Sequence, residues 1–230
     1  MLALPFIKLL DDVYVVAGPS LTHLYDAYAY LLVRNGTALL IDAGSGLAVE
    51  EMFRNIEDIG VKLQTVKYLV ITHGHYDHIG GAGKVKEKTN CKVIMHKFDA
   101  DILEEGKTVL SAADFYGESL EPCEVDLKLE TKDREVLELE DIVLEVFHIP
   151  GHTPGSIALH YESLQKQKVL FGGDLHGPFS SKWRSNVEQW KKSLKRLLEL
   201  DISILCEGHN IVEENPHKWI KELFKNIIQV

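Results

Sequence analysis

Six consecutive residues of the chain concentrate side chains that can bind metal ions. They are His73, Gly74, His75, Tyr76, Asp77 and His78, and they directly follow an apolar run at residues 66–72. Imidazole nitrogen and carboxylate oxygen suit zinc, iron and manganese. Alternate residues of an extended segment can point to one side while the next pair turns elsewhere, so one loop could serve two ions. The segment predicts a metal site, with a solvated histidine-rich turn as the alternative.

Three further loops repeat this arrangement. Each places a histidine or an aspartate just after an apolar, strand-like run, and the residues are His152, Asp174 and His209. In α/β folds, functional residues gather on loops at the carboxyl ends of strands, where a rigid scaffold holds them. Four loops with one pattern favour a metal site over a solvated turn.

The order of these motifs resembles the metallo-β-lactamase superfamily. The motifs are HxHxDH, GHTPG, GD and GH, and they span residues from about Val13 to His209. The glyoxalase-II-like and lactonase-like hydrolases are the branch that the chain resembles. The resemblance implies that one metal ion binds His73, His75 and His152, and a second binds Asp77, His78 and His209. It also implies that Asp174 bridges the two ions.

Two such ions would make a hydrolytic centre. Two divalent cations about 3.5–4 Å apart repel each other, and a bridging carboxylate and a bridging hydroxide hold them together. A water shared by two cations loses a proton near neutral pH and becomes a nucleophile, which Asp77 would orient. An open coordination position can polarise a carbonyl oxygen. We therefore predict a metal-dependent hydrolase of an ester, thioester or lactone, with two divalent ions, zinc first and iron or manganese as alternatives.

The loop after Asp174 supplies a further candidate. His176 lies two residues beyond Asp174, near the metal ions whichever way the loop turns, and is predicted to be catalytic or substrate-facing. The substrate is expected between residues 21–25 and residues 175–183. The expected wall consists of Tyr25, His176, Phe179 and Trp183. A mainly apolar wall suits a small acyl or lactone substrate better than a polyanion.

Other histidines have simpler interpretations. His96, His148 and His160 each stand at the end of a predicted strand, where a half-buried imidazole bonded to the backbone is expected. His217 is expected at the surface. His23 is either an exposed loop residue or part of the pocket wall.

Three other functions stay open from the sequence. Relatives that oxidise persulfides bind a single iron with two histidines and a carboxylate, here His73, His152 and Asp174, so a mononuclear iron sulfur dioxygenase is the main alternative. A phosphodiesterase and a non-enzymatic metal-binding module are the remaining ones. Metal content separates the two-metal hydrolase from the single-iron dioxygenase.

Composition limits the possible partners and location. The chain has 230 residues, of which 45% are hydrophobic, so it can bury one core, and a single domain over residues 1–230 is predicted. The net charge of −10 disfavours nucleic acid and favours a small-molecule substrate. No apolar stretch reaches the length of a membrane span, which disfavours a membrane partner. Three widely spaced cysteines without a CxxC motif indicate a reducing compartment, so a cytoplasmic location is expected, while the oligomeric state stays open.

The hydrophobic pattern predicts two blocks of strands with helices. Strands are expected at residues 13–16, 28–33, 38–41, 66–71, 93–96, 135–139, 142–148, 156–161, 168–171 and 202–206, with Asn35-Gly36 as a hairpin turn. Helices are expected at residues 47–59, 79–88, 98–105 and 187–200, with a last one from Pro216 to Ile227. Residues 107–123 show no clean period and are expected to be mostly helix or loop. Two mixed sheets packed face to face with outer helices make a four-layer αβ/βα sandwich.

Overall fold

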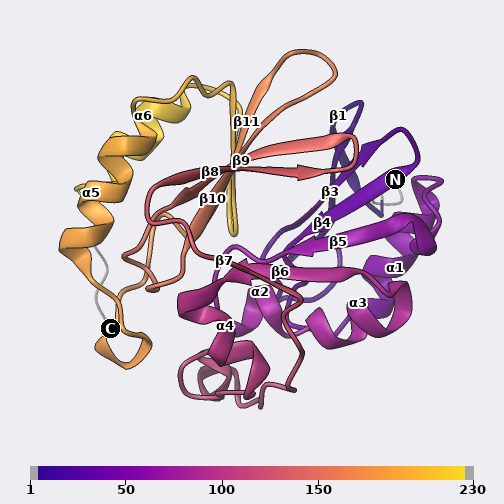
Figure 1. The fold of residues 1–230 in the computed structure, drawn as a ribbon, viewed down its shortest axis with the longest axis horizontal. Helices are drawn as coiled ribbons and strands as arrows, with labels where there is room; N and C mark the ends of the chain where they lie inside the picture. The colour runs from indigo at the N-terminus through magenta and orange to yellow at the C-terminus, as the bar shows by residue number, and fades with distance from the viewer. Residues whose placement is uncertain (1–4, 226–230) are drawn as a thin grey trace.

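Two mixed sheets pack face to face, with helices on both outer sides (Figure 1). The structure, a computed structural model, describes residues 5–225. The first sheet has the strand order β1-β2-β3-β4-β5-β6-β7, and the second has the order β13-β12-β11-β10-β9-β8. The predicted four-layer sandwich is confirmed.

The first sheet changes from antiparallel to parallel at its centre. Its strands are β1 (Ile7–Leu10), β2 (Val13–Ala17), β3 (Ala29–Arg34), β4 (Thr37–Ile41), β5 (Val66–Val70), β6 (Lys92–His96) and β7 (Leu127–Leu129). β1 to β4 pair antiparallel, and β4 to β7 pair parallel. The predicted turn Asn35-Gly36 joins β3 to β4, and both of its residues have positive φ, as a tight hairpin turn requires. Parallel strands need crossover connections, which the helices provide.

Four helices cover the outer face of the first sheet. They are α1 (Val49–Asp58), α2 (Tyr76–Ile79), α3 (Ala82–Thr89) and α4 (Lys97–Glu104). The helix that we expected from residue 79 to residue 88 is instead the pair α2 and α3. Gly80 and Gly81 separate them and approach the backbone of Ser45 and Ala43 so closely that a side chain would clash. Close packing at the two glycines thus determines where the turn that carries the metal-binding motif ends.

The second sheet is mostly antiparallel. Its strands are β8 (Arg134–Leu139), β9 (Ile142–His148), β10 (Ile157–Glu162), β11 (Lys168–Gly173), β12 (Ile204–Glu207) and β13 (Ile211–Val212). Only the pair β11–β12 among the described strands of this sheet is parallel, and its crossover contains α5 (Val187–Leu197). α5 and α6 (Pro216–Leu223) cover the outer face (Figure 1). Asn186 caps α5, since its side chain accepts a hydrogen bond from Gln189 N at 2.9 Å.

The residues of β4 show why the sheets pack in layers. Leu39 and Ile41 belong to the core between the two sheets, whereas Ala38 and Leu40 belong to the core beneath the helices. Successive side chains of a strand point to opposite faces, so a strand that is apolar throughout must be covered on both sides. A third core lies between the second sheet and α5 with α6.

Several predictions about elements were incomplete. The strands β1, β7 and β13 were not expected, and residues 107–123 contain only the short 3-10 helix η2 (Ala113–Tyr116). The expected final residue Ile227 lies outside the described residues. Between residues 5 and 225, no helix has the length and apolar character needed to span a membrane.

Candidate metal centre

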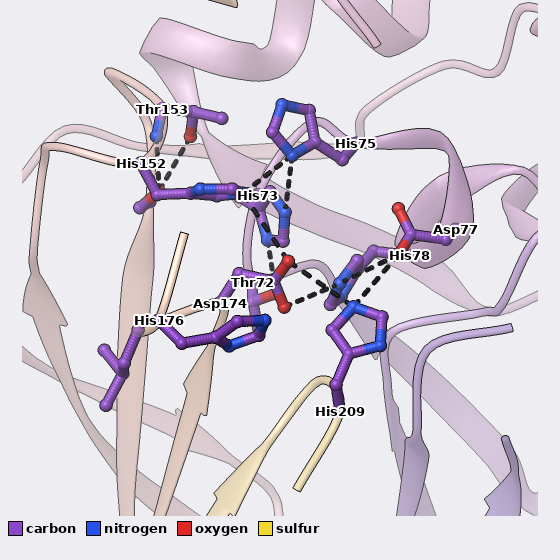
Figure 2. Close-up of polar contacts among 12 residues, drawn as sticks. Thr72, His73, His75, Asp77, His78, His152, Thr153, Asp174, His176 and His209 are labelled. Atoms are coloured by element: carbon purple, nitrogen blue, oxygen red, sulfur yellow. Dashed lines mark hydrogen bonds and ion pairs between the residues drawn. The ribbon is translucent and has the colours of Figure 1, made fainter. Parts of the chain in front are cut away.

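Seven histidine and aspartate side chains converge at the edge where strands of both sheets end (Figure 2). The loop after β5 supplies His73 and His75, and α2 follows directly with Asp77 and His78. The second sheet supplies His152 after β9, Asp174 after β11 and His209 after β12. The centre therefore depends on both halves of the chain.

Three imidazoles form the first group around Asp174. Ligand atoms of His73, His75, His152 and Asp174 all lie within 4.8 Å of one another. His75 Nδ1 lies 2.7 Å from His152 Nε2 and 3.2 Å from His73 Nε2. His152 Nε2 lies 3.6 Å from Asp174 Oδ2. We call this set site one.

A second group shares the same carboxylate. Ligand atoms of Asp77, His78, Asp174 and His209 also lie within 4.8 Å of one another. His78 Nε2 is 3.1 Å from Asp174 Oδ1, and His209 Nε2 is 3.2 Å from Asp77 Oδ2 and 3.5 Å from Asp174 Oδ2. We call this set site two. The structure thus groups the seven predicted residues in the predicted way, and their role as ligands stays a prediction.

The protonation states of the site-one residues suit a cation: the imidazoles are neutral and the carboxylate is charged. Burial lowers the pKa of His75 to about 3, and burial together with neighbouring imidazoles keeps the pKa of His73 and His152 well below the ordinary value. Neutral imidazoles keep a lone pair available for a metal ion. Burial alone would raise the pKa of Asp174, but the imidazoles of His209 and His78 hold it well below the ordinary range, so this carboxylate is charged.

Two buried atoms test whether the donor set fits a metal ion. His78 Nε2 and Asp174 Oδ1 have no hydrogen-bond partner within residues 5–225. Unsatisfied buried polar atoms are costly and rare in folded proteins. A nitrogen and a carboxylate oxygen that face each other without a hydrogen bond suit a divalent cation. The residues present therefore fit a metal centre.

Asp42 contacts, directly or through Thr72, the side of the imidazoles that faces away from the metal centre. Its Oδ2 lies 2.8 Å from His78 Nδ1 and accepts a hydrogen bond from Thr72 Oγ1 at 2.8 Å. Thr72 Oγ1 in turn lies 3.1 Å from His73 Nδ1. Such contacts fix the orientation of each imidazole and leave its Nε2 facing the centre. Neither Asp42 nor Thr72 was identified from the sequence, because no spacing rule links residue 42 to residue 78.

His176 lies at the rim of site two. Its ring centroid is 5.4 Å from that of His209, and its side chain is 26% exposed. His176 Nδ1 lies 3.7 Å from Oε1 of Glu207, a fully buried carboxylate whose Oε2 accepts a hydrogen bond from Trp219 Nε1 at 2.6 Å. His176 was predicted near the centre, and its position beside His209 agrees, but it is not among the residues that line the recess above the centre. Glu207 was not singled out from the sequence.

The recess above the centre has a different wall from the one expected. Beside His75, Asp77, Asp174 and His209, its lining consists of Ala112, Phe115, Tyr116, Pro178 and Trp183. Trp183 was predicted, and its ring lies 5.0 Å from that of His75. Phe179 was predicted incorrectly: it is 3% exposed and packs against Trp190, with ring centroids 5.0 Å apart, in the core beneath α5.

The early loop contributes indirectly. Tyr25 contacts the Tyr116 ring at 5.2 Å but does not line the recess. His23 contacts Tyr25 at 5.1 Å and is likewise outside the lining. Residues 107–123 provide the wall that we expected from residues 21–25. The lack of a clean period in residues 107–123 could have pointed to this wall, since long irregular segments beside a site are often functional.

The histidines expected to be structural bond to backbone oxygens. His96 Nε2 lies 2.9 Å from Thr131 O, His148 Nε2 lies 2.8 Å from Pro154 O, and His160 Nε2 lies 2.9 Å from Asp201 O. The predicted backbone contacts of these three imidazoles are confirmed. His217 was expected at the surface but is partly buried, with Nε2 2.8 Å from Leu200 O.

The chain is similar in sequence to several known proteins. An uncharacterized protein of Aquifex aeolicus is 34% identical over 76% of this chain and 80% of its own length. A hydroxyacylglutathione hydrolase of Pelagibacter ubique is 29% identical over 84% of this chain and 70% of its own. A probable metallo-hydrolase of Methanocaldococcus jannaschii is 28% identical over 87% of this chain and 95% of its own.

Solved structures share the fold. A metallo-beta-lactamase variant of Cronobacter sakazakii superposes with a TM-score of 0.81 at 20% identity, covering 96% of this chain and 94% of that one. A mutant metallo-beta-lactamase of Legionella gormanii gives 0.74 at 24% identity, covering 89% and 79%. The sequence pattern of the family described as the metallo-beta-lactamase superfamily matches residues 24–209. With this match and its paired histidine and aspartate clusters, the chain belongs to the metallo-beta-lactamase superfamily and is a metal-dependent hydrolase.

Proposed function

We propose that the chain hydrolyses an ester, a thioester or a lactone with two divalent metal ions, zinc in the first instance. One observation carries the proposal: two four-residue donor groups share the carboxylate of Asp174. A single ion would need only one group. The second group, with Asp77, His78 and His209, is buried or half-buried and is as compact as the first.

The residues have distinct roles in this reaction. Bound cations would supply a nucleophile from water at neutral pH and a Lewis acid for the carbonyl oxygen. Asp174 would hold the two cations at one distance. Asp77 Oδ2 lies 3.2 Å from His209 Nε2. It would orient the attacking water, because its carboxylate can accept a hydrogen bond from that water. His176, 26% exposed at the rim, would contact the substrate or the leaving group.

The recess favours a small acyl or lactone substrate. Its volume is about 120 Å³. Phe115, Pro178 and Trp183 give it apolar sides, and none of its lining residues is a lysine or an arginine. Any counter-charge for an anionic substrate would therefore come from the proposed metal ions and from His209. The apolar sides support a small acyl or lactone substrate.

The name of one relative suggests a specific comparison. The Pelagibacter ubique protein is a hydroxyacylglutathione hydrolase, so a glutathione thioester belongs in the substrate panel. It should be paired with a thioester of the same acyl group on an uncharged thiol. The ratio of the two kcat/KM values measures whether the leaving group is recognised.

Metal content and a substrate panel test the proposal together. Protein purified without added metal should contain close to two transition-metal ions per chain by elemental analysis. It should hydrolyse at least one of a short ester, thioester or lactone faster than a phosphodiester. A single iron per chain, with oxygen consumption on a persulfide, would instead establish the mononuclear dioxygenase. Hydrolysis of the phosphodiester alone would make the chain a phosphodiesterase.

A further inference from the structure

A buried carboxylate on α4 joins the two turns that supply site one. Asp99 is 0% exposed, and its oxygens accept three hydrogen bonds. Gly74 N donates to Oδ2 at 3.0 Å, Thr153 Oγ1 donates to Oδ2 at 2.5 Å, and Gly155 N donates to Oδ1 at 2.8 Å. Both carboxylate oxygens are therefore used.

The three donors lie on the same two turns as the predicted ligands of site one. Gly74 lies between His73 and His75, and Thr153 directly follows His152. The first turn follows β5 of the first sheet and the second follows β9 of the second sheet. One side chain thus connects turns that are almost 80 residues apart in sequence and that belong to different sheets.

The two glycines leave room for this connection. A Cβ atom at Gly155 would lie 2.6 Å from Asp99 Cγ, and one at Gly74 would lie 2.8 Å from Ile102 Cδ1, also on α4. At Gly155 the clash includes the backbone nitrogen of Asp99 at 2.7 Å, so a side chain there would push the turn away from α4. At Gly74 the nearest atom is the end of the Ile102 side chain, which can shift. This gives a packing reason for the last glycine of the GHTPG motif.

The charge of Asp99 fits the role of an acceptor. Burial raises its pKa to about 6, and the three hydrogen bonds oppose that rise. Gly74 N and Gly155 N can only donate, and they bond to different oxygens, so both oxygens of Asp99 act as acceptors. No lysine or arginine within residues 5–225 forms an ion pair with it at 4.0 Å or less. Its partners are the two turns themselves.

We propose that Asp99 is a positioning residue of site one: it holds the turns at residues 73–75 and 152–155 in the register that brings His73, His75 and His152 together. His75 Nδ1 and His152 Nε2 are 2.7 Å apart. Without the hydrogen bonds to Asp99, these two nitrogens would no longer point to one metal position. The inference rests on the ligand assignment of the proposed function. It is specific to site one, since Asp42, not Asp99, supports His78 of site two.

The test measures zinc affinity at each site separately. The His209→Ala background weakens site two and leaves site one, and the His75→Ala background does the reverse. In each, metal-free protein is titrated with zinc against a chromophoric chelator, with and without Asp99→Asn. The asparagine keeps the shape but replaces one acceptor oxygen with an NH₂ group, which cannot accept from a backbone N–H.

We expect Asp99→Asn to weaken zinc binding at site one by about 10–100-fold, the range seen for groups that orient metal ligands, and to change site two by less than about threefold. The control is Glu104→Gln on the same helix, where Glu104 Oε2 accepts from Lys128 Nζ at 2.7 Å away from the centre. It should leave both affinities unchanged. Equal losses at both sites would show general damage to the fold and would overturn the inference.

A second variant covers the case in which Asp99→Asn does not fold. Thr153→Val keeps the side-chain volume and removes the hydroxyl that donates to Asp99 Oδ2, so site one should again weaken while site two does not. Unchanged zinc affinity at site one in the folded variants overturns the role of Asp99 and leaves the proposed function standing. If the unmodified chain binds no zinc, manganese or iron, the ligand assignment fails, and the inference fails with it.

Discussion

At the scale of single residues, Asp174 has a special place because it belongs to both donor groups. We predict that Asp174→Ala loses most of both metal ions and more than about 100-fold in kcat/KM, because the repulsion between two cations then lacks its shared counter-charge. His75→Ala should lose about one ion and less activity. Elemental analysis and steady-state kinetics on the best substrate measure both effects. Full metal content and turnover in Asp174→Ala would show that Asp174 is not the bridge.

His176 should act on the reaction and not on the metal ions. We predict that His176→Ala lowers kcat/KM by about tenfold or more while two ions stay bound, because its imidazole lies beside His209 without belonging to either donor group. His160→Ala is the matched control, since that imidazole contacts Asp201 O away from the centre. Loss of an ion from His176→Ala would make His176 a ligand. Unchanged kinetics and metal content would place it among the structural histidines.

At the scale of elements, two strand ends from different sheets meet through stacked imidazoles. His96 at the end of β6 and His148 at the end of β9 stack with ring centroids 4.1 Å apart and an angle of 9° between the rings. Both rings are buried, and burial lowers the pKa of His96 to about 4 and lowers that of His148 as well. The pair therefore joins the sheets in its neutral form.

This pair predicts how stability depends on pH. Because the pKa of His96 is lower in the folded chain than in the unfolded one, the unfolded chain binds more protons between about pH 6.5 and pH 4. The stabilising contribution is thus present above pH 6.5 and is lost as the pH falls towards 4. His96→Gln should reduce the drop in unfolding free energy between pH 6.5 and pH 4.5 by roughly 1–2 kcal/mol.

Denaturant unfolding at several pH values measures this slope. Phe98→Leu is the control, because Phe98 contacts both imidazoles, at 5.1 and 5.9 Å, but does not titrate. It should change stability equally at all pH values. An unaltered slope in His96→Gln would contradict the prediction.

At the scale of the whole molecule, the metal centre should stabilise the packing of the two sheets. Its predicted ligands come from loops of both sheets, so a bound ion links the two halves of the chain. A ligand at 100 times its Kd adds about 2.7 kcal/mol, and 1 kcal/mol shifts Tm by about 2–4 °C in a chain of this size. We predict that removing the metal ions lowers Tm by about 5–10 °C.

Calorimetry before and after chelation checks this, with elemental analysis to confirm that the ions are gone. Adding zinc back should restore the original Tm. An unchanged Tm in verified metal-free protein would mean that the packing of the sheets does not depend on the centre.

The sequence alone determined the candidate ligands and most of the elements that carry them. The spacing within residues 73–78 and the apolar runs before His152, Asp174 and His209 are local patterns, and local patterns also locate strands and helices. The weak elements were missed for the same reason: β7 and β13 are three and two residues long and form only because a neighbouring strand is already in place.

Only the tertiary structure decided which residues meet around these ligands. Asp42 and Asp99 support the centre from positions that no sequence period connects to it. Glu207, two residues before His209, faces His176 from the next strand. Phe115 and Tyr116 wall the recess, whereas Phe179 turns into the core beneath α5. The direction of a loop side chain depends on the packing of distant elements, because irregular backbone has no repeat that fixes which side is buried. Local spacing therefore encoded the chemistry of the ligands, and the packing of two sheets determined the shape and support of the site.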